Sequence, residues 1–415
     1  MKPLLKLYVF SIFLLHAFSF VPLASFNFPI AVAASLVCFL QPTPPSFDFR
    51  ASNLLVGGLL GWGIVAWLIY PVPIDLDRFQ GLAQWSASIL ILWIGVRRWI
   101  AVSEISFLEI SKAAWLGSVT LSVFVILEFV LANTAGMYLS DIFPFSIDKF
   151  PEADVFMAGI ARPRGFAAEA GFSAMVFEAL IPLALFYLGQ ASGPSRLIYG
   201  GLCFVALVLL YSTTFFLAAA LTVALLQMIR MNYRKIAGAL AVGMILAYII
   251  AGNSTFFFNA SGYKIFEFFD ALNYSAAQGS RQEALAAAFS LLKGHPFGIG
   301  WGTVLQEAKT YGTPIDEMIG GTGLISLWLE LAIATGIIGL LVFGTFVWKL
   351  LLGLARSTSR EAHCCFLALG MLTIHHIGVY EVWFPMFWFI LGLSQLVLKE
   401  ERIIRHQNAI ALSEV

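Results

Sequence analysis

Long apolar runs separated by short polar connectors fill most of this chain. The runs lie near residues 4–22, 24–40, 53–70, 81–96, 113–132, 166–189, 197–211, 213–229, 236–252, 321–348, 362–378 and 382–398. A helix needs about 17 to 25 such residues to cross a bilayer. The pattern therefore predicts an all-α, polytopic transmembrane helical bundle of about 12 spans, forming a single integral-membrane domain over residues 1–415. The two runs beside Ser212 join so closely that one of them can be re-entrant or broken.

The composition supports this class of protein. Hydrophobic residues make up 60% of the chain and charged residues 12%, and the mean hydropathy of +0.87 excludes an ordinary soluble core. Equal numbers of acidic and basic residues, 24 of each, argue against nucleic acid as a partner. The four cysteines lie inside apolar runs, so we expect small buried side chains rather than disulfides or a metal site.

The positions of the basic residues predict how the chain is threaded. With twelve spans and a cytoplasmic N-terminus, the short connectors place most of these residues in the cytoplasm, as the positive-inside rule requires. They are Arg50, Arg97, Arg98, Lys112, Arg196, Arg230, Arg234, Lys235, Lys349, Arg356, Arg360, Lys399, Arg402 and Arg405. Both termini are then cytoplasmic, and two longer segments, residues 133–165 and 253–320, face the outer side. Because every cytoplasmic connector is short, we expect the function to reside in these two outer loops.

Both outer loops carry cations, against the usual tendency. The basic residues there are Lys149, Arg162, Arg164, Lys264, Arg281, Lys293 and Lys309, with Arg78 in a shorter outer connector. Cations in this position favour an anionic ligand. The alternative is that they pair with nearby acids or with lipid headgroups.

The first candidate site is the segment around Arg162 and Arg164, which directly precedes a long apolar run. Gly165 would let the backbone approach a ligand closely. Glu169 follows one turn further and can either take part in chemistry or hold one of the arginines. Glu178 should lie on the opposite helix face and roughly 13 Å deeper, so we do not expect it to share this site.

The second candidate site lies in the longer outer loop. Ser280-Arg281-Gln282-Glu283 has the capping-box pattern, and the apolar residues that follow predict an amphipathic surface helix near residues 281–293. A guanidinium beside the N–H groups of a helix end makes a good phosphate site, which singles out Arg281. The three glycines between His295 and Gly302 predict a tight loop. His295 can act as an acid, a base or a donor to a sugar, or it can be a structural turn residue.

Three further acids fall inside the predicted membrane spans, near the outer side. They are Glu128, Glu330 and Glu381, the last beside His375 and His376 where two spans turn. An isolated charge there costs roughly 2.5 to 3.5 kcal/mol on insertion scales, so each acid should line a wet cavity or pair. Glu330, His375, His376 and Glu381 are therefore secondary site candidates. A metal site is disfavoured, because two adjacent histidines on a helix cannot both readily reach one ion.

Three motifs between about residues 160 and 345 can be compared with known families. They are Arg162-x-x-Gly165-x-x-x-Glu169, the run from Gly294 to Gly302 after an arginine-started helix, and the run from Leu327 to Leu340. Together they resemble the bacterial O-antigen polymerase and O-antigen ligase superfamily. In order, they are similar to the family's arginine, glycine, glutamate motif, to its large outer loop and to the span that follows this loop. The proline that often follows the glutamate in this family is Ala170 here.

This resemblance implies a GT-C-like membrane glycosyltransferase with an undecaprenyl-pyrophosphate-linked oligosaccharide as donor, acting on the periplasmic face of the bacterial inner membrane. Arg162, Arg164 and Arg281 would bind the pyrophosphate, Arg281 also as a catalytic residue, and Glu169 or His295 would be the base. No metal or other cofactor is expected, because arginines can stabilise the leaving group. Membrane lipids, a chain-length regulator and a flippase are the other partners implied.

Polymerase, ligase and transporter remain the alternatives at this point. Ligases of the superfamily carry a histidine-asparagine pair just before the span after the large loop, whereas this chain has Gly320-Gly321-Thr322-Gly323. This difference favours a polymerase of surface or secreted polysaccharide, with O-antigen ligase second. A secondary transporter would also have about twelve spans with buried acids, but its two halves are commonly similar, and no such similarity is found here.

Overall fold

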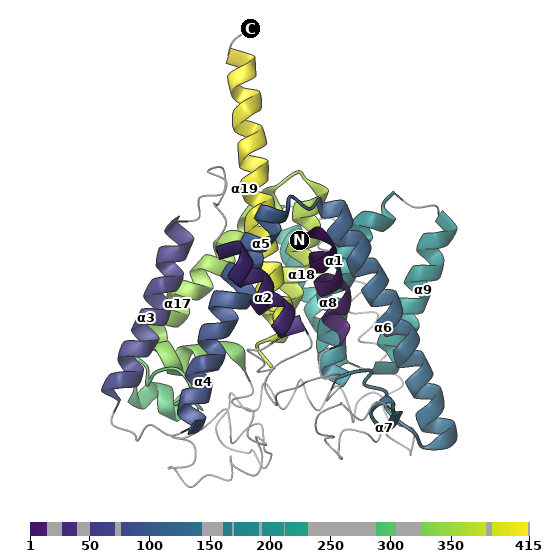
Figure 1. The fold of residues 1–415 in the computed structure, drawn as a ribbon, viewed down its shortest axis with the longest axis horizontal. Helices are drawn as coiled ribbons and strands as arrows, with labels where there is room; N and C mark the ends of the chain where they lie inside the picture. The colour runs from purple at the N-terminus through teal and green to yellow at the C-terminus, as the bar shows by residue number, and fades with distance from the viewer. Residues whose placement is uncertain are drawn as a thin grey trace.

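The computed structural model describes residues 1–14, 27–39, 50–70, 76–142, 161–167, 170–190, 193–210, 212–230, 288–303, 326–378 and 384–413. Its main elements are helices. They are α1 (Lys2–Phe10), η1 (Ser11–Phe13), α2 (Asn27–Phe39), α3 (Arg50–Ile69), α4 (Leu76–Ala87), the π-helix η3 (Ser88–Gly95), α5 (Val96–Ser103), α6 (Phe107–Ala135), α7 (Leu139–Ile142), α8 (Ala170–Leu188), α9 (Gly193–Leu210), α10 (Thr213–Ile229), α17 (Leu327–Arg356), α18 (Arg360–His375) and α19 (Pro385–Ser413). Figure 1 shows them as an upright bundle with α19 projecting from one end.

The helices confirm the predicted class of an all-α, polytopic membrane protein. Among the described residues, six helical stretches are long and apolar enough to cross a membrane: Ser52–Ile69, Arg78–Ser103, Phe107–Ala135, Ala170–Leu188, Gly193–Leu210 and Leu327–Arg356. Two shorter apolar helices cover Phe28–Cys38 and Thr214–Ile229. The count of twelve is not confirmed, because α1 is short and the span expected near 236–252 lies outside the described residues.

Short polar signals in the sequence set the ends of several helices. Ser106 and Glu109 form a capping box at the start of α6, and Gly136 ends this helix with a φ of 65°. Ser326 accepts a hydrogen bond from the third residue of α17, and Ser359 accepts one from Ala362 at the start of α18. These caps satisfy backbone groups that would otherwise be exposed to an apolar environment.

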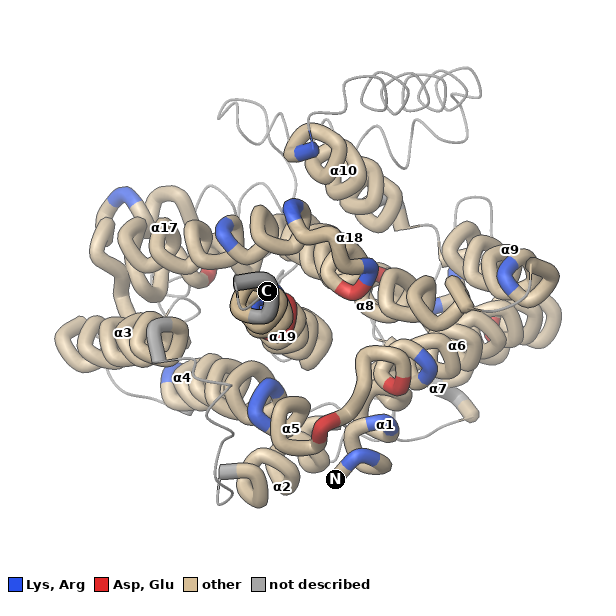
Figure 2. Tube along the Cα trace, turned by 90° about the horizontal axis from the view of Figure 1, so that it is seen from above, with Lys and Arg blue, Asp and Glu red and all other residues tan. Residues whose placement is uncertain are grey.

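Small residues allow the central helices to pack closely. Seen from above, α19 lies within a ring that includes α17, α18, α8, α6, α5, α4 and α3 (Figure 2). On α6, a methyl group added at Gly117 would lie 2.8 Å from the carbonyl oxygen of Phe10. At the next residue, the hydroxyl groups of Ser118 and Tyr199 are 2.9 Å apart and link α6 to α9. Small and hydroxyl residues of this kind are typical of contacts between membrane helices.

The two ends of the bundle differ in what they contain. Helices α3, α6 and α9 finish at one end, where α4, α8 and α10 begin, and we call it the loop end. Helix α18 begins at the other end, from which α19 projects (Figure 1), and we call it the tail end. Helix α10 also finishes there, since Arg230 at its end contacts Ala355 near the end of α17. Residues 136–142 and 161–167 lie at the loop end, and so do residues 295–303 through their contacts with Tyr70 and Arg78. The described parts of both predicted outer loops thus share one end of the molecule.

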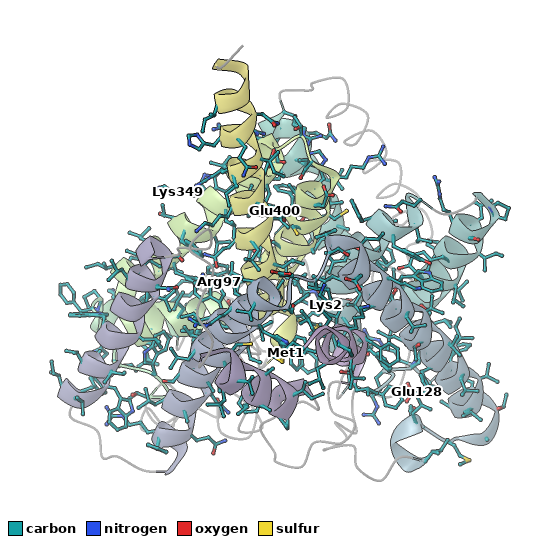
Figure 3. The ribbon with its side chains drawn as sticks, turned by 45° about the horizontal axis from the view of Figure 1, so that its top comes forward. Met1, Lys2, Arg97, Glu128, Lys349 and Glu400 are labelled. Atoms are coloured by element: carbon teal, nitrogen blue, oxygen red, sulfur yellow. The ribbon has the colours of Figure 1, made fainter. Side chains whose placement is uncertain are left out.

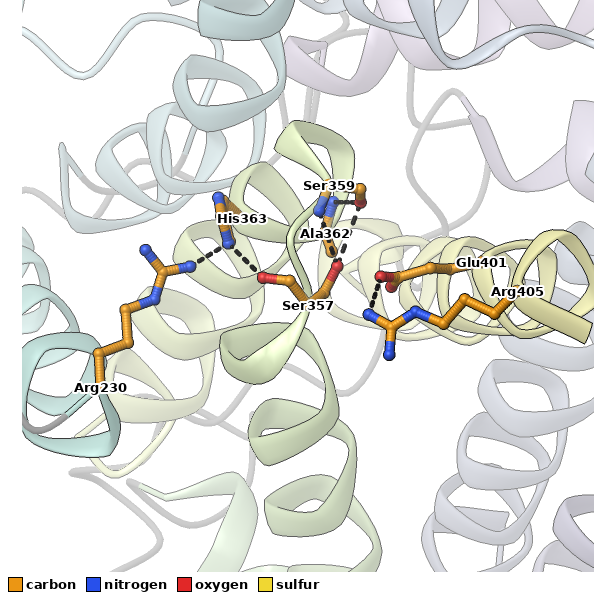
Figure 4. Close-up of polar contacts among 7 residues, drawn as sticks. All are labelled: Arg230, Ser357, Ser359, Ala362, His363, Glu401 and Arg405. Carbon is orange, nitrogen blue, oxygen red and sulfur yellow. Dashed lines mark hydrogen bonds and ion pairs between the residues drawn. The ribbon is translucent and has the colours of Figure 1, made fainter. Parts of the chain in front are cut away.

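Polar side chains join three helices at the tail end (Figure 4). Arg230 follows α10 and contacts the ring of His363 on α18, and its Nε also donates to the carbonyl of Ala355 at 3.2 Å. His363 Nε2 in turn lies 2.8 Å from the carbonyl oxygen of Ser357. These contacts hold the end of α10 against the turn between α17 and α18.

A buried arginine ties the π-helix region to α19. The guanidinium of Arg97, which Figure 3 labels, donates to Gln395 Oε1 at 2.7 Å and to Asn53 Oδ1 at 2.5 Å. Trp93 Nε1 donates to the same Gln395 oxygen at 2.9 Å. Arg97 thus has a structural role in the bundle, since buried cations persist only where such donors and acceptors are matched.

Candidate active site

A buried carboxylate anchors the segment that contains Arg162 and Arg164. Glu128 lies in α6 with no exposed surface, toward the loop end of the molecule (Figure 3). Its Oε2 accepts backbone hydrogen bonds from Arg164 at 2.8 Å and from Gly165 at 2.5 Å. Its Oε1 accepts one from the backbone N–H of Leu139 at 3.2 Å. One side chain therefore holds both α7 and the arginine segment against α6.

Other contacts fix the same segment from both sides. Asn133 makes two hydrogen bonds with the backbone of Ala161, at 2.8 and 3.1 Å. Ser173 in α8 donates to the carbonyl of Arg164. The ring of Phe166 lies 4.7 Å from that of Phe124 and 5.9 Å from that of Phe13, between centroids. This is a rigid setting of the kind that a binding residue requires.

Gly165 has a structural role in this segment. Its φ of 63° is in the left-handed region that favours glycine. This conformation directs its N–H at the protein's own Glu128. A Cβ here would also lie 3.2 Å from Leu121 and 3.3 Å from the Ser173 hydroxyl, which leaves little space for another side chain.

The structure brings Arg162 and Arg164 together on this segment, and their side chains contact different elements. Arg162 Nε donates to the carbonyl of Leu210, the last residue of α9, at 2.7 Å. The Arg164 guanidinium is 5.2 Å from the centre of the Tyr138 ring, and only 4% of the residue is exposed. The carbonyl at a helix C-terminus and an aromatic face both stabilise a cation in an apolar setting.

The glycine-rich loop after His295 fills a break in α17. The helix is interrupted at Gly336, where φ is 74° and ψ is 178°. Ile299 and Gly300 donate backbone hydrogen bonds to Ile333 and Ala334, at 2.9 and 3.0 Å, and Ile337 donates to the carbonyl of Pro296 at 3.0 Å. The loop therefore supplies the partners that an unwound helix lacks inside a membrane.

The three loop glycines are required by this close contact. Gly298, Gly300 and Gly302 have φ values of 91°, 89° and 74°. A Cβ at Gly300 would lie 2.2 Å from the Cα of Trp67, and one at Gly302 would lie 2.7 Å from the carbonyl oxygen of Arg78. The predicted tight loop is thus present, and its backbone packs against protein rather than around a ligand.

Arg78 and Trp301 lock this loop onto α3 and α4. Trp301 is fully buried, and its ring lies 4.6 Å from that of Trp85. Arg78 is also buried, donates from Nε to the Thr303 hydroxyl at 3.1 Å, and lies 4.8 Å from the ring centre of Trp67. Sequence reasoning counted Arg78 among the outer cations without recognising that it binds the loop.

His295 lies at the edge of this loop and is partly buried. Its Nε2 is 3.2 Å from the hydroxyl oxygen of Tyr70, and the two rings are perpendicular with centroids 5.0 Å apart. The N–H of His295 closes the short helix over residues 288–294, the described end of the predicted amphipathic helix, by donating to Leu291. The histidine thus occupies a fixed position at the loop end, with its ring against that of Tyr70.

An ionisable pair that sequence reasoning missed connects α8 to α18. Glu178 Oε1 and His375 Nδ1 are 2.6 Å apart, and both residues are essentially inaccessible to solvent. Glu178 was expected on a different helix face from the arginine site. Its partner His375 is 197 residues away in the chain, so no local sequence pattern indicates the pair. The carboxyl and imidazole groups pair here in an apolar interior, and the second carboxyl oxygen, Oε2, is buried without a hydrogen-bond partner among the described residues.

Of the remaining secondary candidates, the structure describes His376 and Glu330. The carbonyl of His376 accepts hydrogen bonds from the Leu327 N–H and the Ser326 hydroxyl, at 3.2 Å each, and so joins the end of α18 to the start of α17. Glu330 is buried in the first turn of α17. Glu169, Arg281 and Glu381 lie outside the described residues. Within the part of the chain that the structure describes, no three His, Cys, Asp or Glu side chains are grouped to hold a metal.

One comparison with known proteins bears on this site. Residues 198–344 match the family model for O-antigen ligase. The matched stretch contains most of α9, all of α10, the loop after His295 and the broken part of α17, and it ends before the Glu178 partner His375. No curated protein matches the chain. The match supports the resemblance to the O-antigen ligase and polymerase superfamily and indicates membrane glycan transfer of that type.

The role of Gly300 in closing the loop onto α3 can be tested by substitution. We expect Gly300→Ala to destabilise the protein by about 2 to 4 kcal/mol, because it adds left-handed strain to a clash with backbone. The change should appear as a lowered midpoint of thermal unfolding in detergent. Gly294→Ala is the matched control, since nothing lies within 4 Å of a Cβ there. Equal midpoints for the two variants would contradict the proposed fit of the loop.

The Glu178–His375 pair can be tested by a double-mutant cycle. We expect Glu178→Ala alone and His375→Ala alone each to cost about 3 kcal/mol, because either change leaves a buried polar partner behind. The double variant should cost less than the sum of the two. Unfolding midpoints of the four proteins give the coupling, and strictly additive effects would show that the two side chains do not interact.

Proposed function

We propose that this protein is a glycosyltransferase that polymerises undecaprenyl-pyrophosphate-linked oligosaccharide repeat units of a surface or secreted polysaccharide. It would act in the bacterial inner membrane with both termini in the cytoplasm and the loop end facing the periplasm. The observation that carries the proposal is the match of residues 198–344 to the O-antigen ligase family. The placement of the arginine segment and the His295 loop at one end of an apolar bundle is consistent with it.

The chemistry of this reaction requires stabilisation of a departing pyrophosphate. The acceptor hydroxyl attacks the anomeric carbon, and the bond from that carbon to the pyrophosphate oxygen breaks with its electron pair on the leaving group. Arg162 and Arg164 are suited to this task, because an anchored guanidinium in a dry site can contribute about 3 kcal/mol to the transition state. Arg281, at the start of the predicted helix that continues into residues 288–294, is the third proposed ligand and a proposed catalytic residue. Arginines at these places leave no step that needs a metal.

A base must take the proton of the acceptor hydroxyl, and two residues are proposed for this role. Glu169 directly precedes α8 in the sequence, two residues after the anchored segment ends at Ala167. His295 has a ring nitrogen near the Tyr70 hydroxyl, and in this proposal a proton passes from that hydroxyl to the ring. The lipid-linked donor, membrane lipids, a chain-length regulator and a flippase are the proposed partners.

O-antigen ligase activity is the second candidate function. It is favoured by the description of the matching family, whereas the glycines at 320–323, in place of a histidine-asparagine pair, favour the polymerase. A transporter is less favoured. The break in α17 would be the natural place for a transported substrate, but the carbonyl groups of Ile333 and Ala334 there are already bonded to the loop.

Deletion of the protein from its host distinguishes these functions. Lipid-linked oligosaccharides and surface glycan are extracted and sized by mass. We expect single repeat units to accumulate and long chains to disappear, because polymerisation is lost. Full-length lipid-linked polymer left unattached would instead show a ligase. Unchanged pools of both would contradict glycan transfer altogether.

Complementation with variants tests the site in the same strain. We expect Arg162→Ala and Arg281→Ala to restore no product while remaining at wild-type levels in the membrane, because each removes a cation that stabilises the leaving group. Arg196→Ala is a suitable control, since Arg196 is exposed and donates to the carbonyl of Gly189 at the tail end. An active Arg281→Ala variant would remove this residue from the site.

A further inference from the structure

Glu128 is a buried acid that the proposed chemistry does not use. A carboxylate in a membrane helix is costly and is retained where it has a role. Glu128 lies entirely inside the protein, and it accepts hydrogen bonds from three backbone N–H groups, those of Leu139, Arg164 and Gly165. Since these groups belong to two segments that are distant in sequence, the carboxylate connects the two segments.

The backbone of the arginine segment forms an anion site that Glu128 already fills. The adjacent N–H groups of Arg164 and Gly165 point at the same carboxylate oxygen, and Gly165 adopts the left-handed conformation. Successive N–H groups in such a turn bind phosphate in other proteins. Because Glu128 occupies this site, a pyrophosphate at the loop end cannot use these amides. Beside this segment it would be held by side chains.

The same carboxylate sets the positions of both partners of the Arg164 side-chain contact. One oxygen fixes the Arg164 backbone, and the other fixes Leu139, whose neighbour Tyr138 carries the ring that the guanidinium faces at 5.2 Å. On the opposite side, Ser173 of α8 holds the Arg164 carbonyl. Arg164 is therefore clamped between α6 and α8, and its guanidinium direction depends on Glu128.

We propose that Glu128 is a positioning residue for pyrophosphate binding: by filling the backbone anion site it aims the Arg164 guanidinium, beside Tyr138, at the pyrophosphate of the lipid-linked donor. This inference rests on the proposed function. It assigns the recognition of the ligand to a guanidinium rather than to backbone amides. Glu128 itself touches no ligand atom in this proposal.

Binding of farnesyl pyrophosphate to the purified full-length protein in lipid nanodiscs tests the proposal without requiring turnover. We expect Glu128→Gln to weaken binding about tenfold, because an amide cannot accept from all three N–H groups and the guanidinium loses its direction. Glu109→Gln is the matched control. It makes the same chemical change on the same helix at the tail end, where Glu109 caps α6 and pairs with Lys6, and its affinity should equal that of the wild type.

A double-mutant cycle separates positioning from a general loss of structure. We expect Arg164→Ala to weaken binding about tenfold or more, and Glu128→Gln to add almost nothing in that background. Fully additive losses would overturn the proposal, because Glu128 would then act through another group. If Glu128→Gln does not fold, Ser173→Ala removes the other clamp on Arg164. Ser173→Ala should also weaken binding, and it should add almost nothing when combined with Arg164→Ala. Wild-type affinity in Ser173→Ala would overturn the proposal.

The outcomes distinguish this inference from the function on which it rests. Wild-type affinity in Glu128→Gln, with weak binding in Arg164→Ala, would overturn the positioning role alone. A wild-type protein that binds no prenyl pyrophosphate would contradict the proposed function, and the positioning role would fail with it.

Discussion

The structure depends on how polar groups are satisfied inside an apolar bundle. Without water, every buried carboxylate and every unwound stretch of backbone must find its partners within the protein. Glu128 meets this requirement with three backbone N–H groups and in doing so fixes α7 and the arginine segment. The shape of the loop end at the start of α8 therefore follows from the need to satisfy one acid.

The break in α17 is resolved in the same way, mostly by backbone groups, with the Trp62 indole N–H donating to the carbonyl of Thr335 at 3.1 Å. The loop over residues 296–300 bonds to Ile333, Ala334 and Ile337, and Trp301 and Arg78 fasten the loop to α3 and α4. The loop end thus has two rigid parts, one built on α6 and α8 and the other on α3, α4 and α17. Rigid parts of this kind can hold charged side chains in fixed directions, which a site for glycan transfer needs.

Much of the fold can be predicted from the sequence. The apolar runs predict α3, α6, α8, α9 and α10 closely, because length and hydropathy alone decide which segments can cross a bilayer. The break at Gly336 was not predicted, since a single glycine is common in membrane helices and only its contact with the distant loop explains the conformation. The total number of spans, which rests on residues beyond the described ranges, stays a prediction.

The site is predicted less completely, because its contacts join distant parts of the chain. The grouping of Arg162 and Arg164 follows from their neighbouring positions. Their anchor Glu128 is 36 residues away from Arg164, and a pattern of residue types carries no sign of such a pair. The hydrogen bond of Gly165 to Glu128 is missed for the same reason. Positive φ could be expected from a glycine, but what its N–H binds depends on which helix packs beside it.

The most direct test of the account is reconstitution of the purified protein in liposomes that contain the host's undecaprenyl-pyrophosphate-linked repeat units. The products are separated by mass over time. The account predicts a ladder of lipid-linked chains that grows by whole repeats, with one undecaprenyl pyrophosphate released for each repeat added. Donor that stays unchanged, in a preparation whose protein is folded and correctly inserted, would contradict it.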